Sequence, residues 1–271
     1  MQHLNPDTST TYQELSGWKH QVFLRLNTIG CQTRHVASDP FSLLLAEGFA
    51  MAFHLVDVNN TFEPPMLIEL QAKWKEKGIQ LIQLWEDVWA ARPEQVMHRI
   101  SALMGLNTRI HGRQTLLSRI DKKEAENFLE RNHLQGYVNS RYKFGLYYKS
   151  ELVAVATFSA LRKMNHSPNY HSAELIRFAV QAGFSINGGL SKVIKHFAAL
   201  LQPNDLMTYA DRDWSAGKAY LKLGFNAVAT LSPAFFELDG SSRQHLIGNS
   251  KPVDSVRSVF NTGSIKYILK F

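Results

Sequence analysis

The stretch Ser185–Leu201, SINGGLSKVIKHFAALL, decides most about the fold of this 271-residue chain. It follows SAELIRFAV at 172–180, a short apolar run that predicts a β-strand. Gly188 and Gly189 predict a tight turn, because glycine adopts backbone conformations closed to other residues. The residues after the turn, up to Leu201, predict a helix. The stretch therefore indicates a strand, a glycine turn and a helix in succession.

A turn of this kind can bind an anion. The first N–H groups of a helix have no intrahelical acceptor, and the helix dipole favours negative charge at that end. Ser191 adds a hydroxyl and Lys192 adds a positive charge. We therefore predict contacts to a phosphate or pyrophosphate from Asn187, Gly188, Gly189, Leu190, Ser191 and Lys192. The alternative is a turn that only connects two elements.

The same pattern of strands and helices extends on both sides of this stretch. Towards the C-terminus we expect a strand at Leu206–Ala210, a helix at Ser215–Leu223, a strand at Asn226–Thr230 and a last strand in SIKYILKF. Towards the N-terminus we expect a strand at Thr115–Ile120, a helix that Asp121 caps, and strands at Phe144–Tyr148 and Leu152–Ala160. Strands mixed with helices indicate an α/β (α+β) fold, with a mixed sheet flanked by helices.

The first 105 residues predict a smaller α/β unit. An amphipathic helix is expected around Tyr12–Leu26, and two apolar strands lie around Glu47-Gly48 within 41–58. A helix at 66–78 ends at Gly78, a strand follows at 79–85, and Pro93 opens a helix that ends before Gly105. The stretch Gly105–Gly112 separates this unit from the next. We therefore expect two domains, 1–105 and 106–271.

Charge is unevenly distributed between these two parts. The chain carries a net charge of +7, and residues 106–271, with 22 basic and 12 acidic residues, carry +10. Lysine and arginine gain by displacing counterions from phosphates, so the second part is a candidate for binding nucleic acid. A well-solvated basic surface is the alternative.

Composition indicates the cellular compartment and excludes some kinds of site. The one cysteine, Cys31, excludes an internal disulfide and a cysteine-rich metal site. No segment reaches the roughly 18 apolar residues of a membrane span, and the polar N-terminus lacks the apolar core of a signal peptide. These features predict a cytoplasmic protein with no membrane partner.

Two motifs in the second part resemble the GNAT acyltransferases. AYLKLGF at 219–225 matches the Tyr-x-x-x-Gly-Phe pattern of that family through Tyr220, Gly224 and Phe225. The glycine turn matches in part, since only Gly189 of the family's Gln/Arg-x-x-Gly-x-Gly/Ala pattern is kept. The resemblance covers about residues 113–232 and implies an acyl-CoA-dependent transferase with acetyl-CoA, or a related acyl-CoA, bound at the turn. It also implies that Tyr220 protonates the departing thiolate, for which a phenol is suited because it stays protonated at neutral pH.

A narrower resemblance points to an acceptor. MTYAD at 207–211, followed by Gly217, Tyr220 and Gly224-Phe225, looks like the Mom-type DNA-modification proteins of phages and mobile elements. This resemblance implies a DNA base as acceptor, with Arg177, Ser191 and Asp211 near the reacting base. Each of these two charged residues also has a purely structural interpretation. Arg177 could be an exposed residue of its strand, and Asp211 could be a helix cap or an ion-pair partner.

The first part resembles Vsr-like, PD-(D/E)xK-type endonuclease domains in KGIQLIQLWEDVW at 77–89, through Glu86, Asp87 and Trp89. The catalytic pattern is absent: His54 stands where a metal-binding carboxylate is expected. Asp57, Glu47 and Glu69 are the remaining candidates for a metal site, so we interpret 1–105 as a degenerate endonuclease-like domain that binds or packs. The eleven histidines show no metal-ligand spacing, and no metal is predicted.

Three functions remain open at this stage. The first is a GNAT-type N-acyltransferase that modifies a nucleic acid. The second is a catalytically inactive, endonuclease-derived nucleic-acid-binding protein. The third is a GNAT enzyme that acylates a small amine or a protein lysine. Affinity for acyl-CoA separates the second from the others, and affinity for nucleic acid separates the third.

Overall fold

The computed structural model describes residues 15, 17–165, 167–215, 217–246 and 257–271. The chain forms two compact units. Unit 1 comprises residues 1–93 and 233–262, and unit 2 comprises residues 94–232 and 263–271. The division differs from the expected one in two ways: the helix at 93–104 goes with unit 2, and a later segment of the chain returns to unit 1.

Unit 1 is built on a four-stranded sheet in the order β1-β2-β3-β4. Its strands are β1 (Thr33–Ser38), β2 (Phe41–Ala46), β3 (Met51–Val56) and β4 (Gln80–Trp85), with helices α1 (Gly17–Thr28), α2 (Pro64–Glu76) and α3 (Glu86–Ala91). The first three strands are antiparallel, whereas β3 and β4 run parallel and α2 connects them. The two apolar strands, the helix and the strand at 79–85 expected here are confirmed.

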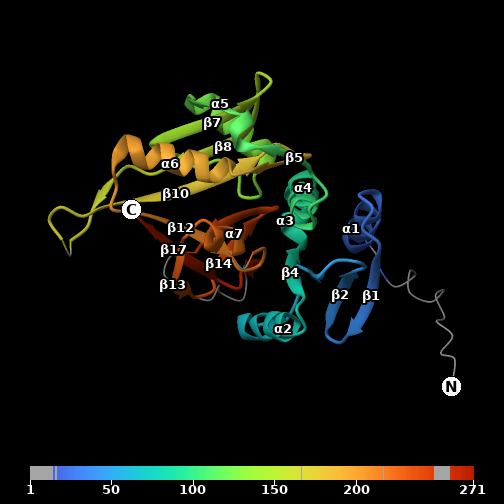
Figure 1. The fold of residues 1–271 in the computed structure, drawn as a ribbon. Helices are drawn as coiled ribbons and strands as arrows, with labels where there is room; N and C mark the ends of the chain where they lie inside the picture. The colour runs from blue at the N-terminus through green and yellow to red at the C-terminus, as the bar shows by residue number, and fades with distance from the viewer. Residues whose placement is uncertain (1–14, 16, 166, 216, 247–256) are drawn as a thin grey trace. The chain divides into compact units, whose positions relative to one another are not determined.

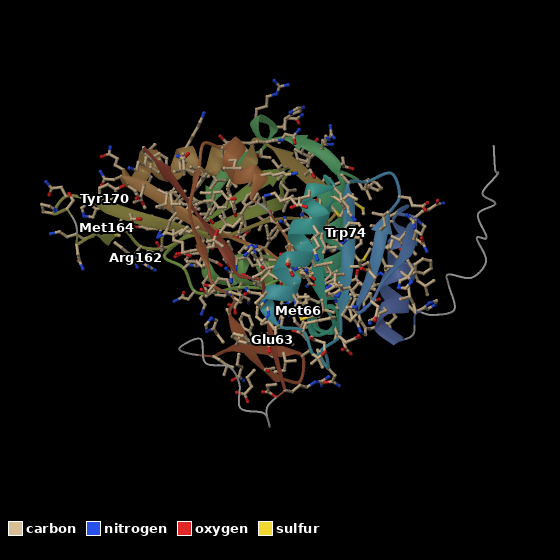
Figure 2. The ribbon with its side chains drawn as sticks, turned by 90° about the horizontal axis from the view of Figure 1, so that it is seen from below. Glu63, Met66, Trp74, Arg162, Met164 and Tyr170 are labelled. Carbon is tan, nitrogen blue, oxygen red and sulfur yellow. The ribbon has the colours of Figure 1, made fainter. Side chains whose placement is uncertain are left out.

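Helix α2 illustrates how local sequence sets an element of unit 1. Pro64 and Pro65 open the helix, where a missing N–H costs nothing, and Glu63 lies at its N-cap. Leu67, Leu70 and Trp74 repeat at helical spacing and are buried against the sheet. Figure 2 shows Glu63 and Met66 at the first turn and Trp74 towards the other end. Of the helix expected over Tyr12–Leu26, positions 12–14 and 16 lie outside the described residues.

The segment that returns to unit 1 forms a small second sheet. Its strands are β14 (Phe235–Asp239), β15 (Ser242–His245) and β16 (Ser258–Phe260), in the order β15-β14-β16. Val259 and Phe260 are buried in one cluster with Val56, Leu67 and Trp85. The ring of Phe260 meets that of Trp85 edge to face, with centroids 5.0 Å apart. Residues far apart in the sequence therefore share the core of unit 1.

Unit 2 contains a larger, mixed sheet in the order β13-β17-β12-β10-β8-β7-β6, with β9 on β10 (Figure 1). The strands are β6 (Leu116–Arg119), β7 (Tyr142–Tyr148), β8 (Glu151–Phe158), β9 (Arg162–Lys163), β10 (His171–Val180), β12 (Asp205–Asp211), β13 (Asn226–Leu231) and β17 (Ser264–Lys270). The helices are α4 (Pro93–Met104), α5 (Lys122–Asn132), α6 (Gly189–Leu201) and α7 (Lys218–Lys222). A short parallel pair, β5 (Thr108–His111) and β11 (Phe184–Asn187), was not expected.

Helices α5 and α6 cover opposite faces of this sheet. Phe197 of α6 packs in one cluster with Phe144 and Phe158, and the rings of Phe158 and Phe197 stack 4.1 Å apart. Phe128 of α5 packs in another cluster with Val155. Val155 and Phe158 point to opposite faces because side chains alternate along a strand. The predicted mixed α/β sheet flanked by helices is thus confirmed.

Candidate functional site

Two neighbouring parallel strands of unit 2 separate part of the way along their length. β10 and β12 pair only where Ser172–Glu174 of β10 lie beside Asp205–Met207 of β12. Both strands continue beyond this pairing, β10 to Val180 and β12 to Asp211. Beyond Glu174, β10 shifts its register against β8 between Leu175 and Arg177, which marks a β-bulge. The hydroxyl of Thr208 donates to the Leu175 carbonyl, 3.0 Å away. Beyond this point, the backbone groups on the facing edges of β10 and β12 do not form hydrogen bonds to one another.

The glycine turn begins helix α6 as the sequence predicted. Gly188 lies in the left-handed region, with φ of 76°, and is the N-cap of the helix. A Cβ atom on Gly189 would lie 2.7 Å from Ile186 Cγ2, and one on Gly112 would lie 2.9 Å from the carbonyl carbon of Gly188. Both positions therefore require glycine, because the Gly188 backbone at Gly112 and the Ile186 side chain at Gly189 leave no room for a Cβ atom.

The start of α6 presents unpaired backbone donors. The first helical hydrogen bond runs from the Lys192 N–H to the Gly188 carbonyl, 3.0 Å away. Within the described part of the chain, the amides of Gly189, Leu190 and Ser191 have no acceptor. Three N–H groups at the positive end of a 13-residue helix can bind the oxygens of a phosphate.

Lys192 does not point its charge at this turn. Its Nζ donates to the carbonyl oxygens of Gly112, at 3.1 Å, and Thr115. The ammonium thus holds the 112–115 segment against the helix, and a direct contact to a phosphate would require breaking these bonds. Asn187, the last residue of β11, is exposed beside the turn and pairs with His111 of β5.

Tyr220 is carried by the short helix α7. Its ring packs against Phe225 and Tyr267, with centroids 5.5 and 5.6 Å away. Gly217, with φ of 68°, makes room for this arrangement, because a Cβ atom there would overlap the Tyr267 hydroxyl. Among the described residues no group bonds to the Tyr220 hydroxyl. Packing fixes the ring, and the hydroxyl could therefore form a hydrogen bond to a ligand.

Arg177 lies just past the bulge, within electrostatic reach of Tyr220 and Glu174. Burial lowers the pKa of the Arg177 guanidinium, and the nearby Glu174 and Tyr220 oppose this change. Its Nε donates to the Gly136 carbonyl at 3.3 Å, and Nη1 donates to the Ile176 carbonyl at 3.0 Å. A guanidinium has five N–H donors, so donors remain for an acceptor or an anion.

Asp211, at the end of β12, stabilises the turn that leads to α7. Its Oδ1 accepts the N–H of Asp213 at 3.0 Å, and its carbonyl accepts the N–H of Ser215 at 2.9 Å. This capping role is the structural alternative noted for Asp211 from the sequence. Asp211 also lies within electrostatic reach of Arg99. Arg177 on β10 and Asp211 on β12 therefore each lie near another charged side chain, Glu174 and Arg99 respectively.

Glu174 and Arg99 join this site, although neither was identified from the sequence. Regular alternation would put Glu174 and Arg177 on opposite faces of β10, but the extra residue of the bulge returns them to the same face. Burial lowers the pKa of Arg99 on α4, while Tyr220 and Asp211 oppose the change. Arg99 as a whole residue is nevertheless exposed to solvent.

The three residues of unit 1 that suggested an endonuclease-like motif in the sequence have structural partners. Glu86 Oε2 accepts the Val58 N–H at 2.8 Å, and Trp89 Nε1 donates to Gln21 Oε1 at 3.3 Å. Asp87, almost fully buried, accepts two hydrogen bonds from Arg243, at 2.6 and 3.0 Å. These three matches support packing, and none of them lines a carboxylate cluster.

The other metal candidates of unit 1 are dispersed. Asp57 accepts from Trp18 Nε1 at 2.9 Å and from Lys19 Nζ at 2.5 Å, while Glu47 and Glu69 are exposed. Across the described residues, no group of three or more histidine, cysteine, aspartate or glutamate side chains could hold a metal ion. In the same part of the chain, no helix is long and apolar enough to cross a membrane.

His54 is fully buried in unit 1 and neutral at physiological pH. Its Nδ1 lies 2.6 Å from Gln83 Oε1, and Gln83 Nε2 donates to the Leu67 carbonyl, so Nδ1 carries the proton. Burial lowers the pKa of His54 to about 4, with Lys19 contributing in the same direction and Gln83 and Asp57 opposing it. Its site, between the rings of Phe41 and Phe62, favours the uncharged imidazole.

We expect unit 1 to lose stability in acid because of His54. The unfolded chain protonates this side chain below pH 6.5, whereas the folded protein resists protonation until about pH 4. The contribution to stability is therefore fully present above pH 6.5 and is lost as the pH falls from 6.5 to 4. The loss amounts to about 3 kcal/mol. Urea unfolding at several pH values should show this slope, and His54→Phe should flatten it; an unchanged slope in His54→Phe would assign the acid sensitivity to other groups.

Comparison with known proteins gives structural matches only. No family model matches the chain, and no curated protein matches it. Among solved structures, an acetyltransferase from Bacillus subtilis in complex with CoA is 14% identical with a TM-score of 0.40, and 58% of this chain covers 99% of that one. A GNAT family acetyltransferase from Elizabethkingia anophelis with acetyl-CoA bound is 13% identical with a TM-score of 0.38, at the same coverage. The ribosomal-protein-S18-alanine N-acetyltransferase from Escherichia coli is 18% identical with a TM-score of 0.37, and 58% of this chain covers 93% of it.

Proposed function

We propose that unit 2 is an acyl-CoA-dependent N-acyltransferase of the GNAT type, and that its acceptor is a base of a nucleic acid. The observation that carries this proposal is the separation of β10 from β12 beyond Glu174 and Met207. Two parallel strands that part expose backbone donors and acceptors on both edges, which an extended ligand with amide groups can pair with. The pantetheine arm of an acyl-CoA is a ligand of that kind.

Two further features suit the ends of such a ligand. The unpaired amides of Gly189, Leu190 and Ser191 would donate hydrogen bonds to the pyrophosphate oxygens. The hydroxyl of Tyr220, without a partner among the described residues, would face the sulfur of the thioester. Asn187 and Gly188 would shape the turn around the pyrophosphate, and Lys192 would support the turn from behind through its carbonyl contacts.

The residues around the bulge suit the transfer itself. The amine nitrogen of the acceptor attacks the thioester carbonyl carbon, a C–N bond forms, and the C–S bond breaks. Glu174 lies 3.9 Å from the Arg162 guanidinium and within electrostatic reach of Arg177. It would take the proton from the attacking nitrogen, directly or through a water molecule. Tyr220 would give its proton to the departing sulfur, and solvent restores both groups. Arg177 and Arg99 would stabilise negative charge near that hydroxyl.

The nucleic-acid acceptor is supported by charge. Residues 106–271 carry a net charge of +10, which favours a polyanionic acceptor over a small amine. The resemblance of the 207–225 region to Mom-type DNA-modification proteins favours DNA. An enzyme that acts on a base within a duplex must turn that base out of the stack, so it needs anchors for the neighbouring phosphates.

Unit 1 supports a second, subordinate proposal. Its order α1-β1-β2-β3-α2-β4, with β3 and β4 parallel, suits a degenerate endonuclease-like domain. The acidic residues near its sheet are engaged by Lys19, Trp18 and Arg243. We infer a binding or packing role for this unit and no metal-dependent cleavage of nucleic acid.

Acetyl-CoA binding by calorimetry tests the main proposal. Ser191→Asp puts a carboxylate among the unpaired amides, where it stabilises the helix start but repels a pyrophosphate. It should weaken acetyl-CoA binding at least about tenfold, which corresponds to roughly 1.4 kcal/mol. Gly189→Asp is less suitable, because its Cβ atom would clash with Ile186.

A matched control makes the result specific. Ser118→Asp introduces the same charge change at an exposed position of β6 and should leave the affinity unchanged. If folded wild-type protein does not bind acetyl-CoA, the proposed transferase activity is wrong. Binding without transfer to nucleic acid, but with transfer to a small amine or to a lysine, would reassign the acceptor.

A further inference from the structure

Four positive side chains gather at one edge of the sheet in unit 2. Arg119 ends β6, and Lys122 begins α5. Arg141 directly precedes β7, and Lys143 is its second residue. The Ile120 N–H donates to the Lys143 carbonyl at 3.1 Å, which brings the end of β6 against β7. Arg119, Lys122 and Arg141 are exposed, and Lys143 is half-buried. We refer to these four residues as the basic edge.

The positive charges of the basic edge are not neutralised by ion pairs within the described residues. In the described structure none of its four side chains forms an ion pair, unlike Lys19 with Asp57 or Arg243 with Asp87. The acidic groups nearest in sequence are engaged elsewhere. Asp121 caps α5 by accepting the Glu124 N–H at 2.8 Å, and Glu124 accepts the Tyr147 hydroxyl at 2.5 Å.

The cations of the basic edge lie close enough to repel one another. Burial, followed by the charges of Arg119, Lys122 and Arg141, lowers the pKa of Lys143. A negatively charged ligand would relieve this repulsion, since opposite charges within a few ångströms favour the charged form of a group. The Lys143 ammonium donates to the Ser140 carbonyl at 2.5 Å, which leaves two of its three donors.

A row of side chains connects the basic edge to the candidate site. Lys143 of β7 lies directly opposite Thr157 of β8, and Thr157 lies directly opposite Arg177 of β10. Directly opposed residues share a face of the sheet, and strands lie about 4.8 Å apart, so the backbones of Lys143 and Arg177 are about 10 Å apart.

Unsatisfied hydroxyl groups accompany this row. Ser140 Oγ and Thr157 Oγ1 are buried, and neither has a hydrogen-bond partner among the described residues. A buried hydroxyl without a partner costs free energy, so a bound oxygen atom, from water or from a ligand, would be stabilising here. Lys143 and the unpaired hydroxyl of Thr157 thus lie on the face that carries Arg177.

We propose that the basic edge is the docking surface for the phosphodiester backbone of the nucleic-acid acceptor, and that it directs a base towards Arg177 and Tyr220. This inference rests on the proposed acceptor. Four cations spread over two strands and a helix suit a repeated anion better than one phosphate, because each phosphate that is neutralised releases counterions. No contact to a base edge is required, so binding through this surface should depend little on sequence.

The salt dependence of binding tests the proposal. A fluorescently labelled DNA duplex and a single strand of the same sequence would be titrated with full-length protein at several salt concentrations. Neutralising two exposed members of the basic edge, Lys122→Gln with Arg141→Gln, should reduce the slope of log K against log salt by about 2. The matched control, Lys73→Gln with Lys75→Gln on the exposed face of α2, makes the same change in net charge and should leave the slope unaltered.

Three results would overturn the proposal. Wild-type protein that binds neither DNA form excludes it, and an equal loss of slope in both double variants would assign binding to net charge alone. Equal affinity for a heparin oligosaccharide of matched charge would reject nucleic acid as the occupant. The assay contains no acyl-CoA, so a failure of the proposed transferase reaction would be seen separately, in acetyl-CoA binding.

Discussion

Tyr220→Phe should lower the turnover number of acyl transfer by about 10²- to 10⁴-fold, the usual contribution of a general acid. The substitution removes only a hydroxyl that has no partner among the described residues, while the ring keeps its contacts with Phe225 and Tyr267. Stability and the affinity for acetyl-CoA should therefore remain close to those of the wild type. The measurement is transfer of a radiolabelled acetyl group from acetyl-CoA to DNA.

A tyrosine outside the site provides the control for this experiment. Tyr148→Phe on β7 removes a hydroxyl from a half-buried tyrosine of the same unit and should leave turnover unchanged. Full activity of Tyr220→Phe would exclude the phenol as the acid. A large loss of acetyl-CoA affinity together with turnover would instead indicate that the hydroxyl contributes to binding rather than to proton transfer.

Arg243→Ala should destabilise unit 1 by about 3–5 kcal/mol, because it leaves the buried carboxylate of Asp87 without a counter-charge. The guanidinium also lies over the rings of Trp85 and Phe236, at 5.6 and 5.3 Å from their centroids, and those contacts are lost with it. Urea unfolding followed by tryptophan fluorescence would measure the change, with Arg34→Ala on β1 as an exposed arginine control in the same unit.

The double variant Asp87→Leu with Arg243→Met completes the test. Replacing both partners of a buried ion pair by apolar side chains is often neutral, so this variant should be closer to wild type than Arg243→Ala. If Arg243→Ala, Arg34→Ala and the double variant all have the same free energy of unfolding, the ion pair does not stabilise unit 1.

By the same reasoning, a fragment ending at residue 105 should not fold stably, since it lacks Arg243 and the buried Phe260.

Domain boundaries show where prediction from the sequence reached its limit. Composition and charge change near Gly105, which suggested a division there, whereas the contacts divide the chain at residue 93 and return 233–262 to unit 1. Asp87 and Arg243 are 156 positions apart. A pairing over such a distance leaves no local pattern, because it depends on which buried surfaces meet after the chain has folded.

The candidate site was partly accessible from the sequence. The turn before α6 was predicted because two glycines followed by an apolar helical repeat are a local signal, and the structure has it at Gly188 and Gly189. Glu174 was not predicted, since strand alternation puts it on the face opposite Arg177 and only the bulge reverses this. Arg99 was not predicted because α4 lies in the sequence far from the residues whose charges it meets.

The sequence by itself determined the elements whose signals lie within a few residues: helix ends at proline, glycine and capping aspartate, and apolar strands bounded by turns. Only the tertiary structure decided the use of individual polar groups. It directs the Lys192 ammonium to two backbone carbonyls, the Asp211 carboxylate to its own turn, and Glu174 to the side of Arg177. The physical reason is that local propensity selects backbone conformation, whereas a charged side chain finds its partner only when burial has brought distant segments together.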